Sequence, residues 1–363
     1  MNRMKLAVIS IIVLFILGIL TKLIYDSFKM DDVQLKKPLE QFIWSEMTFD
    51  NGMLKTTFKS TSGEHYSLAE SLGLWMEYAV MSDNEPLFQH AYNLLNKYYA
   101  GDVGLVHWRV LANGKPTEDV NAFLDDIRIV QALLDASEKW EESKYEKRAK
   151  NISKALEKYS TYEDTFVDFY DWKHETKSHQ FTTTYFDLWT MRRLNERGWV
   201  DEKTIQEMER LAYELSQIDS PLLPTAYDID SQQFIYKDTV NMSEQVYGAY
   251  HLARAGVRTE SFYTFIKQEF NTHQKLFGQY EANGAPAAKV ESPALYGLTI
   301  LYALEVQDEE LALSLYERMK AFQVQEGTYA GVYMDTKAVD THIFDNLVPL
   351  MAERSLQERG LIR

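Results

Sequence analysis

The apolar residues of this chain recur at positions i, i+3 and i+4 along almost its whole length, and this spacing limits the folds open to it. Such spacing marks one face of an α-helix, whereas a half-buried strand alternates every second residue. We expect a first helix over residues 36–47. The pattern predicts further helices over residues 67–82, 85–99, 120–140, 143–159, 182–196, 201–218, 241–256, 258–274, 290–305, 308–323 and 340–357.

The connections between these segments alternate in length. Short connections such as Ser82–Pro86 and Arg197–Trp199 join two helices into a pair, and longer connections with Gly and Thr join successive pairs. Pairs that recur about every 50–60 residues without recognisable sequence repetition differ from an open solenoid, which normally has a clear repeat. The chain is therefore predicted to be all-α, an (α/α)6 barrel of six helical hairpins.

The longer loops contain the only strand-like sequence. Leu105–Leu111 runs into Asn113 and Gly114, a dipeptide that closes β-hairpins. Asp164–Trp172 and Tyr227–Tyr236 are further aromatic, acidic loops. Since functional groups gather on loops that a rigid scaffold holds, we expect these loops to line a cleft.

The N-terminal segment differs from the rest. Leu6–Leu20 is nearly unbroken apolar sequence that continues to Tyr25, and a membrane-spanning helix needs about 20 such residues. We therefore expect residues 6–25 to be a transmembrane anchor. A cleaved signal peptide is the alternative, but no small-x-small cleavage site follows the apolar run. The chain has no cysteine, which excludes a lipoprotein anchor.

The charges beside this segment predict its orientation. Arg3 and Lys5 precede it and acidic residues follow it, so the positive-inside rule places the N-terminus in the cytoplasm. The expected domains are a cytoplasmic stub (1–5), the anchor, a linker (26–35) and one extracellular domain (36–363). The protein is predicted to be a single-pass protein of the cell membrane.

The charge balance and the missing motifs exclude several functions. A net charge of −16 argues against a nucleic-acid partner, which needs a basic surface. The eight histidines lack His-Glu-x-x-His or a comparable spacing, so no catalytic metal and no cofactor are expected. Neither a Gly-rich phosphate loop nor a Gly-x-Ser-x-Gly motif is present.

Glu70 is the most informative of the 54 acidic residues, because it begins an otherwise apolar helix between Ala69 and Ser71. Small neighbours would let a substrate approach, and burial would raise the pKa of Glu70, as a general acid requires. The alternative is a glutamate that the helix dipole favours in the first turn.

The segment Ala69–Ala79 resembles the signature of glycoside hydrolase family 8, in which Ser-Glu-Gly is followed by Tyr-Gly-Met and an alanine. Glu70, Met76 and Ala79 fall in register, whereas Ser71 and Leu74 replace the Gly and the Tyr. The resemblance implies that Glu70 is the proton donor.

The segment Asp125–Trp140 resembles a second part of that family, an Asp-x-Asp-Leu helix that ends in Ala-Leu-Leu and then Trp. Asp126 matches the later aspartate and Leu124 replaces the earlier one. The resemblance implies that Asp125 and Asp126 bind the central sugar. The alternative is N-terminal capping, with Asp126 and Arg128 on the solvated surface.

The segment Thr183–Trp189 resembles the family's Pro-Ser-Tyr-Phe loop without its two prolines. The resemblance implies that Tyr185 faces the cleft, although packing in the core is an equal alternative. Together with Trp108, Tyr185 is a candidate platform for a sugar ring, because aromatic faces stack on the apolar faces of sugars.

The general base is an aspartate in the family, and the corresponding helix here begins at Val240–Tyr247. Glu244 is its best-placed carboxylate, and Asp238 and Asp228 are alternatives. If Glu70 and Glu244 form the pair, the resemblance implies a separation of about 6.5–9.5 Å and inversion of the anomeric centre.

These three segments follow the family's order, and the chain is most similar to the divergent branch encoded beside exopolysaccharide synthases (the PssZ and YdaJ type). The resemblance implies an endo-acting, inverting hydrolase of a β-linked exopolysaccharide, in a biofilm matrix or on the cell surface. Its partners would be the polysaccharide, the cytoplasmic membrane and an exopolysaccharide synthase complex. One alternative is a non-catalytic glycan-binding or assembly protein. Another is a polysaccharide lyase or unsaturated-uronide hydrolase, against which the acidic balance argues.

Overall fold

The computed structural model describes residues 33–59 and 65–363, and within these ranges every helix expected from the apolar spacing is present. A π-helical turn, η1 (Leu95–Tyr99), continues α4, and a 3-10 turn, η2 (Thr183–Tyr185), precedes α7. The helices are α2 (Pro38–Glu46), α3 (Ala69–Met81), α4 (Glu85–Leu94), α5 (Phe123–Trp140), α6 (Ser143–Tyr159), α7 (Leu188–Glu196), α8 (Glu202–Ser216), α9 (Met242–Arg254), α10 (Glu260–His273), α11 (Pro293–Glu305), α12 (Glu309–Lys320) and α13 (Phe344–Glu358).

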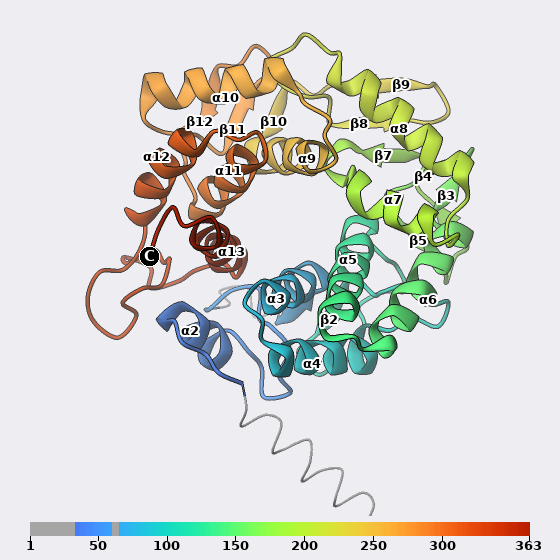
Figure 1. The fold of residues 1–363 in the computed structure, drawn as a ribbon, viewed down its shortest axis with the longest axis horizontal. Coiled ribbons are helices and arrows are strands. Elements are labelled where there is room, and N and C mark those ends of the chain that lie inside the picture. Colours follow the sequence, from blue (N-terminus) through green and yellow to red (C-terminus); the bar gives the residue numbers. More distant parts are fainter. Residues whose placement is uncertain (1–32, 60–64) are drawn as a thin grey trace, which may run out of the picture.

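The helices form two concentric rings (Figure 1). The inner ring consists of α3, α5, α7, α9, α11 and α13, which contact one another in this order, and α13 closes the ring against α3. The remaining helices pack outside it, as α4 does on α3 and α12 on α11. This is the expected (α/α)6 barrel, and the N-terminal ends of its inner helices meet at one mouth.

The expectation of six hairpins was wrong in one respect. Five inner helices form a hairpin with the outer helix that follows them, but the sixth pair joins α13 to α2 from the other end of the barrel domain. The reason is geometric: this domain begins with an outer helix and ends with an inner one, so closing the ring brings the two together. The Tyr78 hydroxyl fastens α2 further, since it donates a hydrogen bond to the buried carboxylate of Glu40.

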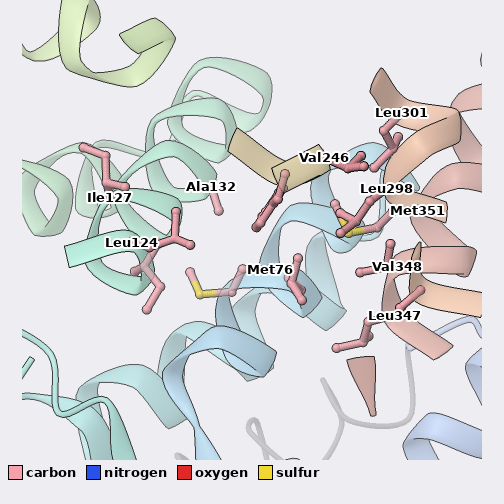
Figure 2. Close-up of a cluster of buried hydrophobic side chains, with 14 of the residues drawn as sticks. Met76, Leu124, Ile127, Ala132, Val246, Leu298, Leu301, Leu347, Val348 and Met351 are labelled. Atoms are coloured by element: carbon pink, nitrogen blue, oxygen red, sulfur yellow. The ribbon is translucent and has the colours of Figure 1, made fainter. Parts of the chain in front are cut away.

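The core lies between the two rings and inside the inner ring. Pro293–Leu304 of α11 is buried at every residue, as expected for a helix covered on all sides. The outer helix α8 buries only one stripe of residues, including Ile205, Met208 and Leu211. Figure 2 shows apolar side chains that the inner helices contribute: Met76, Leu124, Ile127, Ala132, Val246, Leu298, Leu301, Leu347, Val348 and Met351.

Short antiparallel ladders occupy the long loops. Two pairs are β3 (Thr161–Tyr162) with β4 (Thr165–Phe166), and β5 (Tyr170–Asp171) with β6 (Thr176–Lys177). The two three-stranded sheets are β7 (Gln180–Thr182), β8 (Ala226–Asp228) and β9 (Gln233–Ile235), and β10 (Thr239–Asn241), β11 (Gln279–Glu281) and β12 (Pro286–Ala288).

The strand-like loop before Asn113 and Gly114 has a partner that was not expected. The turn forms, and the Leu111 amide donates to the Lys115 carbonyl at 2.8 Å. However, β2 (Arg109–Leu111) pairs in register with β1 (Tyr66–Leu68), whose last two residues were predicted to be helical. This pairing matters for the site, because β1 leads directly into the first turn of α3.

No helix in the described ranges is long and apolar enough to span a membrane. The stub and the anchor predicted for residues 1–25, and the first part of the predicted linker, lie outside the described residues.

Candidate active site

A cavity of about 560 Å³ opens at the mouth where the inner helices begin. Its wall combines the N-terminal ends of α3, α5, α9 and α13 with the long loops between the helix pairs. Its carboxylates are those of Glu70, Asp125 and Glu244, and its aromatic side chains are those of Trp108, Tyr185, Tyr247 and Phe344. The cavity thus unites five of the candidate residues, and it leaves out Asp126 and the two alternative bases, Asp228 and Asp238.

Glu70 is the second residue of α3, and β2 holds the start of that helix in place. The Ala69 amide donates to the Trp108 carbonyl at 2.9 Å, which fixes the first turn of α3 against the loop that carries Trp108. Burial raises the pKa of Glu70, and the charge of Arg128 partly offsets that rise. Burial thus shifts the pKa of Glu70 in the direction that the sequence predicted.

Asp125 lies in the first turn of α5 and is 8% exposed. The Arg128 Nη1 donates to its Oδ1 at 3.0 Å. Burial raises the pKa of Asp125 to about 7, with Arg128 lowering it and Glu70 raising it further. Two carboxyl groups from neighbouring helices thus influence each other, and both charges together are disfavoured at this mouth of the barrel.

The expectation that Asp126 binds sugar does not agree with its position. Asp126 is fully buried and outside the cavity wall, where it accepts hydrogen bonds from the Val106 amide at 3.0 Å and from Asn121 Nδ2 at 2.6 Å. The alternative of a solvated pair was also wrong, because Arg128 is only 1% exposed. Asp126 instead fastens the loop before α5.

Glu244 lines the same cavity from the first turn of α9 and is exposed. Its surroundings raise the pKa of Glu244 by desolvation, and the nearby Lys237 lowers it. The alternative bases lie outside the cavity wall: Asp228 accepts hydrogen bonds from the amide and hydroxyl of Ser231, and Asp238 is exposed on its loop. Glu244 is therefore the candidate base that reaches the cavity.

Trp108 and Tyr185 are half-buried in the cavity wall. The guanidinium of Arg109 lies 4.6 Å from the centre of the Trp108 ring and supports it from one side. The position of Tyr185 depends on Gly248 of α9, where an added Cβ would lie 3.1 Å from the Thr183 carbonyl oxygen. Glycine thus lets η2 pack directly on the helix that carries Glu244.

Several polar residues of the cavity were not predicted, among them Thr182, Thr184, Lys237 and Asn241. They belong to loops and strand ends, where no apolar period marks the exposed side. Tyr247 had a usable signal, since it follows Glu244 by three residues and so lies on the same face of α9.

A second cavity, of about 370 Å³, lies toward the other end of the barrel and is lined only by residues of inner helices. Burial raises the pKa of Glu77 there to about 7, while burial lowers the pKa of His251 to about 3. Both ring nitrogens of His251 lack a hydrogen-bond partner among the described residues. Tyr247 belongs to the wall of both cavities. Since the described residues that line the second cavity include none from a loop, we assign the chemistry to the first.

Across residues 33–59 and 65–363, no group of three or more His, Asp or Glu side chains is arranged to hold a metal ion.

The fold and the carboxylates at its mouth define the class of barrel glycoside hydrolases. The model of the family described as glycosyl hydrolases family 8 matches residues 16–167. The putative lipoprotein YdaJ of Bacillus subtilis (strain 168) is 33% identical over 331 residues, which cover 90% of this chain and 89% of YdaJ. The chain therefore belongs to glycosyl hydrolase family 8, in a divergent branch with YdaJ, and is a glycoside hydrolase.

Among the solved structures that superpose on most of this chain are the following two. A novel alpha-amylase from Clostridium perfringens superposes with a TM-score of 0.80 and 26% identity, over 87% of this chain and 96% of the amylase. PssZ from Listeria monocytogenes superposes with a TM-score of 0.69 and 23% identity, over 87% of this chain and 94% of PssZ. The likeness to PssZ concerns the fold alone.

Proposed function

We propose that this protein hydrolyses a polysaccharide with Glu70 as general acid and Glu244 as general base. One observation carries the proposal: the two carboxyl groups enter a single cavity from the first turns of two inner helices, in different surroundings. Burial favours the protonated form of Glu70 against the charge of Arg128, whereas Glu244 is exposed, and Lys237 works against the desolvation that raises the pKa of Glu244. Such a division between two carboxyl groups suits an acid and a base.

In the proposed reaction, the protonated Glu70 donates its proton to the glycosidic oxygen as the bond from that oxygen to the anomeric carbon breaks. A water molecule forms the new bond to the anomeric carbon and loses its proton to Glu244. Because water attacks from the side opposite the leaving group, the product has the inverted configuration. Exchange with solvent then restores both carboxyl groups.

The remaining candidate residues would bind the sugar. Asp125 accepts a side-chain hydrogen bond from Arg128 at Oδ1, and its carboxyl group has further acceptor sites for sugar hydroxyls. Trp108 and Tyr185 offer aromatic faces on which sugar rings could stack. Asp126 is not included, because Val106 and Asn121 already occupy its oxygens.

The first substrate that we propose is a β-linked exopolysaccharide, which the enzyme cuts at internal linkages. An α-glucan is the second candidate, because the structural neighbour of 26% identity is an alpha-amylase. The cavity walls suit either substrate, since stacking and hydroxyl contacts do not by themselves select the linkage.

We also propose that residues 6–25 anchor the enzyme in the cell membrane with domain 36–363 outside, beside an exopolysaccharide synthase complex. The naming of YdaJ as a putative lipoprotein supports a membrane-associated extracellular location. This chain has no cysteine, so we propose attachment through the apolar segment and not through a cysteine-linked lipid.

The test is release of reducing ends by the purified full chain, with Glu70→Gln in parallel. The panel contains exopolysaccharide, β-glucans, xylan, chitosan and starch. Loss of the general acid is expected to lower kcat by about 10²–10⁴-fold on the substrate that is cut. Glu202→Gln is the control, because Glu202 also lies in a first helical turn but is exposed on the outer helix α8.

Activity that Glu70→Gln retains in full would contradict the assignment of the acid. If no polymer is cut but the wild type and Glu70→Gln bind a glycan equally, the hypothesis of a non-catalytic glycan-binding protein replaces this proposal. Release from starch alone would replace the β-linked substrate by an α-glucan.

A further inference from the structure

Arg128 is a charged side chain in the middle of the barrel, and the mechanism above gives it no role. It is among the largest side chains that are fully buried, with 1% exposed. Burial alone lowers the pKa of Arg128, but Tyr247 and the carboxylates of Asp125, Glu77 and Glu70 raise it above its ordinary value. The guanidinium is therefore charged, and its surroundings must compensate that charge.

The guanidinium is held at two sides. Nη1 donates to Asp125 Oδ1 at 3.0 Å, and Nε and Nη2 both donate to the Tyr247 hydroxyl, at 3.0 and 2.9 Å. Because Tyr247 belongs to the walls of both cavities, Arg128 lies where the catalytic mouth meets the second cavity. The two hydrogen bonds to Tyr247 connect α5 to α9 beneath the proposed catalytic site, and the bond to Asp125 lies within α5.

The aliphatic part of Arg128 crosses α3 at Gly73. A Cβ added there would lie 2.9 Å from Arg128 Cδ and 3.2 Å from Cγ. Glu70, Gly73 and Glu77 follow one another at three and four residues, so they share one face of α3. Gly73 thus leaves the space through which Arg128 passes between the two glutamates.

The charge of Arg128 acts on titratable groups of four elements. Its charge lowers the pKa of each of the three nearby carboxyl groups. The groups are Glu70 and Glu77 on α3, Asp125 on α5, Tyr185 in η2, and Tyr247 and His251 on α9.

We propose that Arg128, held by Tyr247 and accommodated by Gly73, is a positioning residue that orients Asp125 toward the substrate and sets the charge around Glu70. The inference rests on the proposed function, in which Glu70 is the acid. It adds that a buried cation, and not the cavity wall alone, adapts that acid to its working pH.

The test compares kcat and KM across pH for the full chain with Arg128→Lys, Arg128→Met, Tyr247→Phe and Gly73→Ala. In Arg128→Met the alkaline limb of kcat, which reports loss of the acid's proton, is expected to move up by about one pH unit or more. Its kcat is expected to fall by about 100-fold, because Asp125 loses the group that orients it. Arg128→Lys keeps the charge, so the alkaline limb is expected to stay near its wild-type position. Its kcat should still fall, because Asp125 loses the guanidinium that orients it.

Gly73→Ala displaces the stem of Arg128 without removing its charge, so it is expected to lower kcat as Arg128→Lys does. Tyr247→Phe loses the common acceptor and should do the same. Arg254→Met is the matched control: Arg254 lines the second cavity, and its Nη1 donates to Gln131 Oε1 at 2.9 Å. It should leave the alkaline limb in place.

A readout without substrate accompanies these assays. Removing the cation raises the pKa of three carboxyl groups, so the unfolding free energy of Arg128→Met should decline more steeply between pH 5 and pH 8 than that of the wild type. The extra slope should correspond to on the order of one additional proton bound by the folded state. If Arg128→Met does not fold, Arg128→Lys and Gly73→Ala decide through their kcat.

Suppose that Glu70→Gln is inactive but the Arg128 variants keep the wild-type kcat, alkaline limb and pH dependence of the unfolding free energy. This result would overturn the inference and leave the proposed function in place. A fully active Glu70→Gln would instead remove the proposed acid, whatever Arg128 does. An equal shift of the limb in Arg254→Met would also overturn it, since any buried cation would then suffice.

Discussion

Asn121 Nδ2 donates to Asp126 Oδ2 at 2.6 Å, and the same amide group accepts from the Tyr170 backbone N–H at 2.7 Å. Asp126 also accepts from the Val106 amide at 3.0 Å. Two long loops of the catalytic mouth are therefore attached to the first turn of α5 through one carboxylate and one amide. The loop that carries Trp108 depends on this attachment.

Asp126→Ala should therefore reduce stability more than substrate affinity. The Val106 amide and the Asn121 side chain would both lose a buried acceptor, at a cost of about 2–4 kcal/mol in the free energy of unfolding. Denaturant unfolding measures this loss, with Asp102→Ala on an exposed turn of the same loop as control. A raised KM at unchanged stability would instead support Asp126 as a sugar ligand.

Glu244→Gln should lower kcat by about 10²–10⁴-fold, because a glutamine cannot take the proton from the attacking water. Asp228→Asn and Asp238→Asn should remain active, since neither aspartate lines the cavity. Proton NMR of the first-formed product should show the inverted anomer. An inactive Asp238→Asn beside an active Glu244→Gln would move the base to the preceding loop.

Glu77 should make the protein less stable as the pH rises. The pKa of Glu77 is about 7 in the folded chain against 4.5 for the free side chain, because burial disfavours the charge. The folded state thus binds more protons between these values, and the unfolding free energy falls as the pH rises through them. Glu77→Gln should remove up to about 3 kcal/mol of this decline. Chemical unfolding from pH 4 to pH 8 measures it, and the exposed Glu317→Gln on α12 should leave the decline as in the wild type.

His251 should act in the opposite direction. Burial lowers the pKa of His251 to about 3 from 6.5, so the unfolded state binds the extra proton between these values. Stability is therefore lost as the pH falls through this range. His251→Phe keeps an aromatic ring beside Tyr247, 4.5 Å away between ring centres, and removes the titration. Its unfolding free energy relative to wild type should rise from pH 7 to pH 4; a difference that does not change with pH would disprove the idea.

The predicted parts of the site share a local signal. Glu70, Asp125 and Glu244 each lie in the first turn of an apolar helix, and the helix period places that turn within a few residues. The barrel then brings the first turns of its inner helices together without further information. Helix spacing located these first turns, whereas the resemblance to family 8 selected the carboxylates among them.

The residues that were missed depend on partners far along the chain. Arg128 next to two aspartates is an ordinary surface pattern, and only Gly73 on another helix creates the buried space that it fills. Likewise, Ser67 and Leu68 continue an apolar helical spacing, but pairing with Val110 and Arg109 makes them a strand. The local sequence of neither segment indicates the burial of Arg128 or the strand at Ser67 and Leu68.

The pairing of α13 with α2 and α3 has a consequence for synthesis. Arg354 Nε donates to the Met81 carbonyl at 3.0 Å, across a separation of 273 residues. Until residues 344–358 have been synthesised, the nascent chain lacks α13 although the earlier helices are complete. At this stage α3 has no neighbour on one side, and α2 lacks the inner helix on which it packs. Ring closure is thus a late, long-range step, and a nascent chain stalled before α13 would expose the apolar seam to chaperones and proteases.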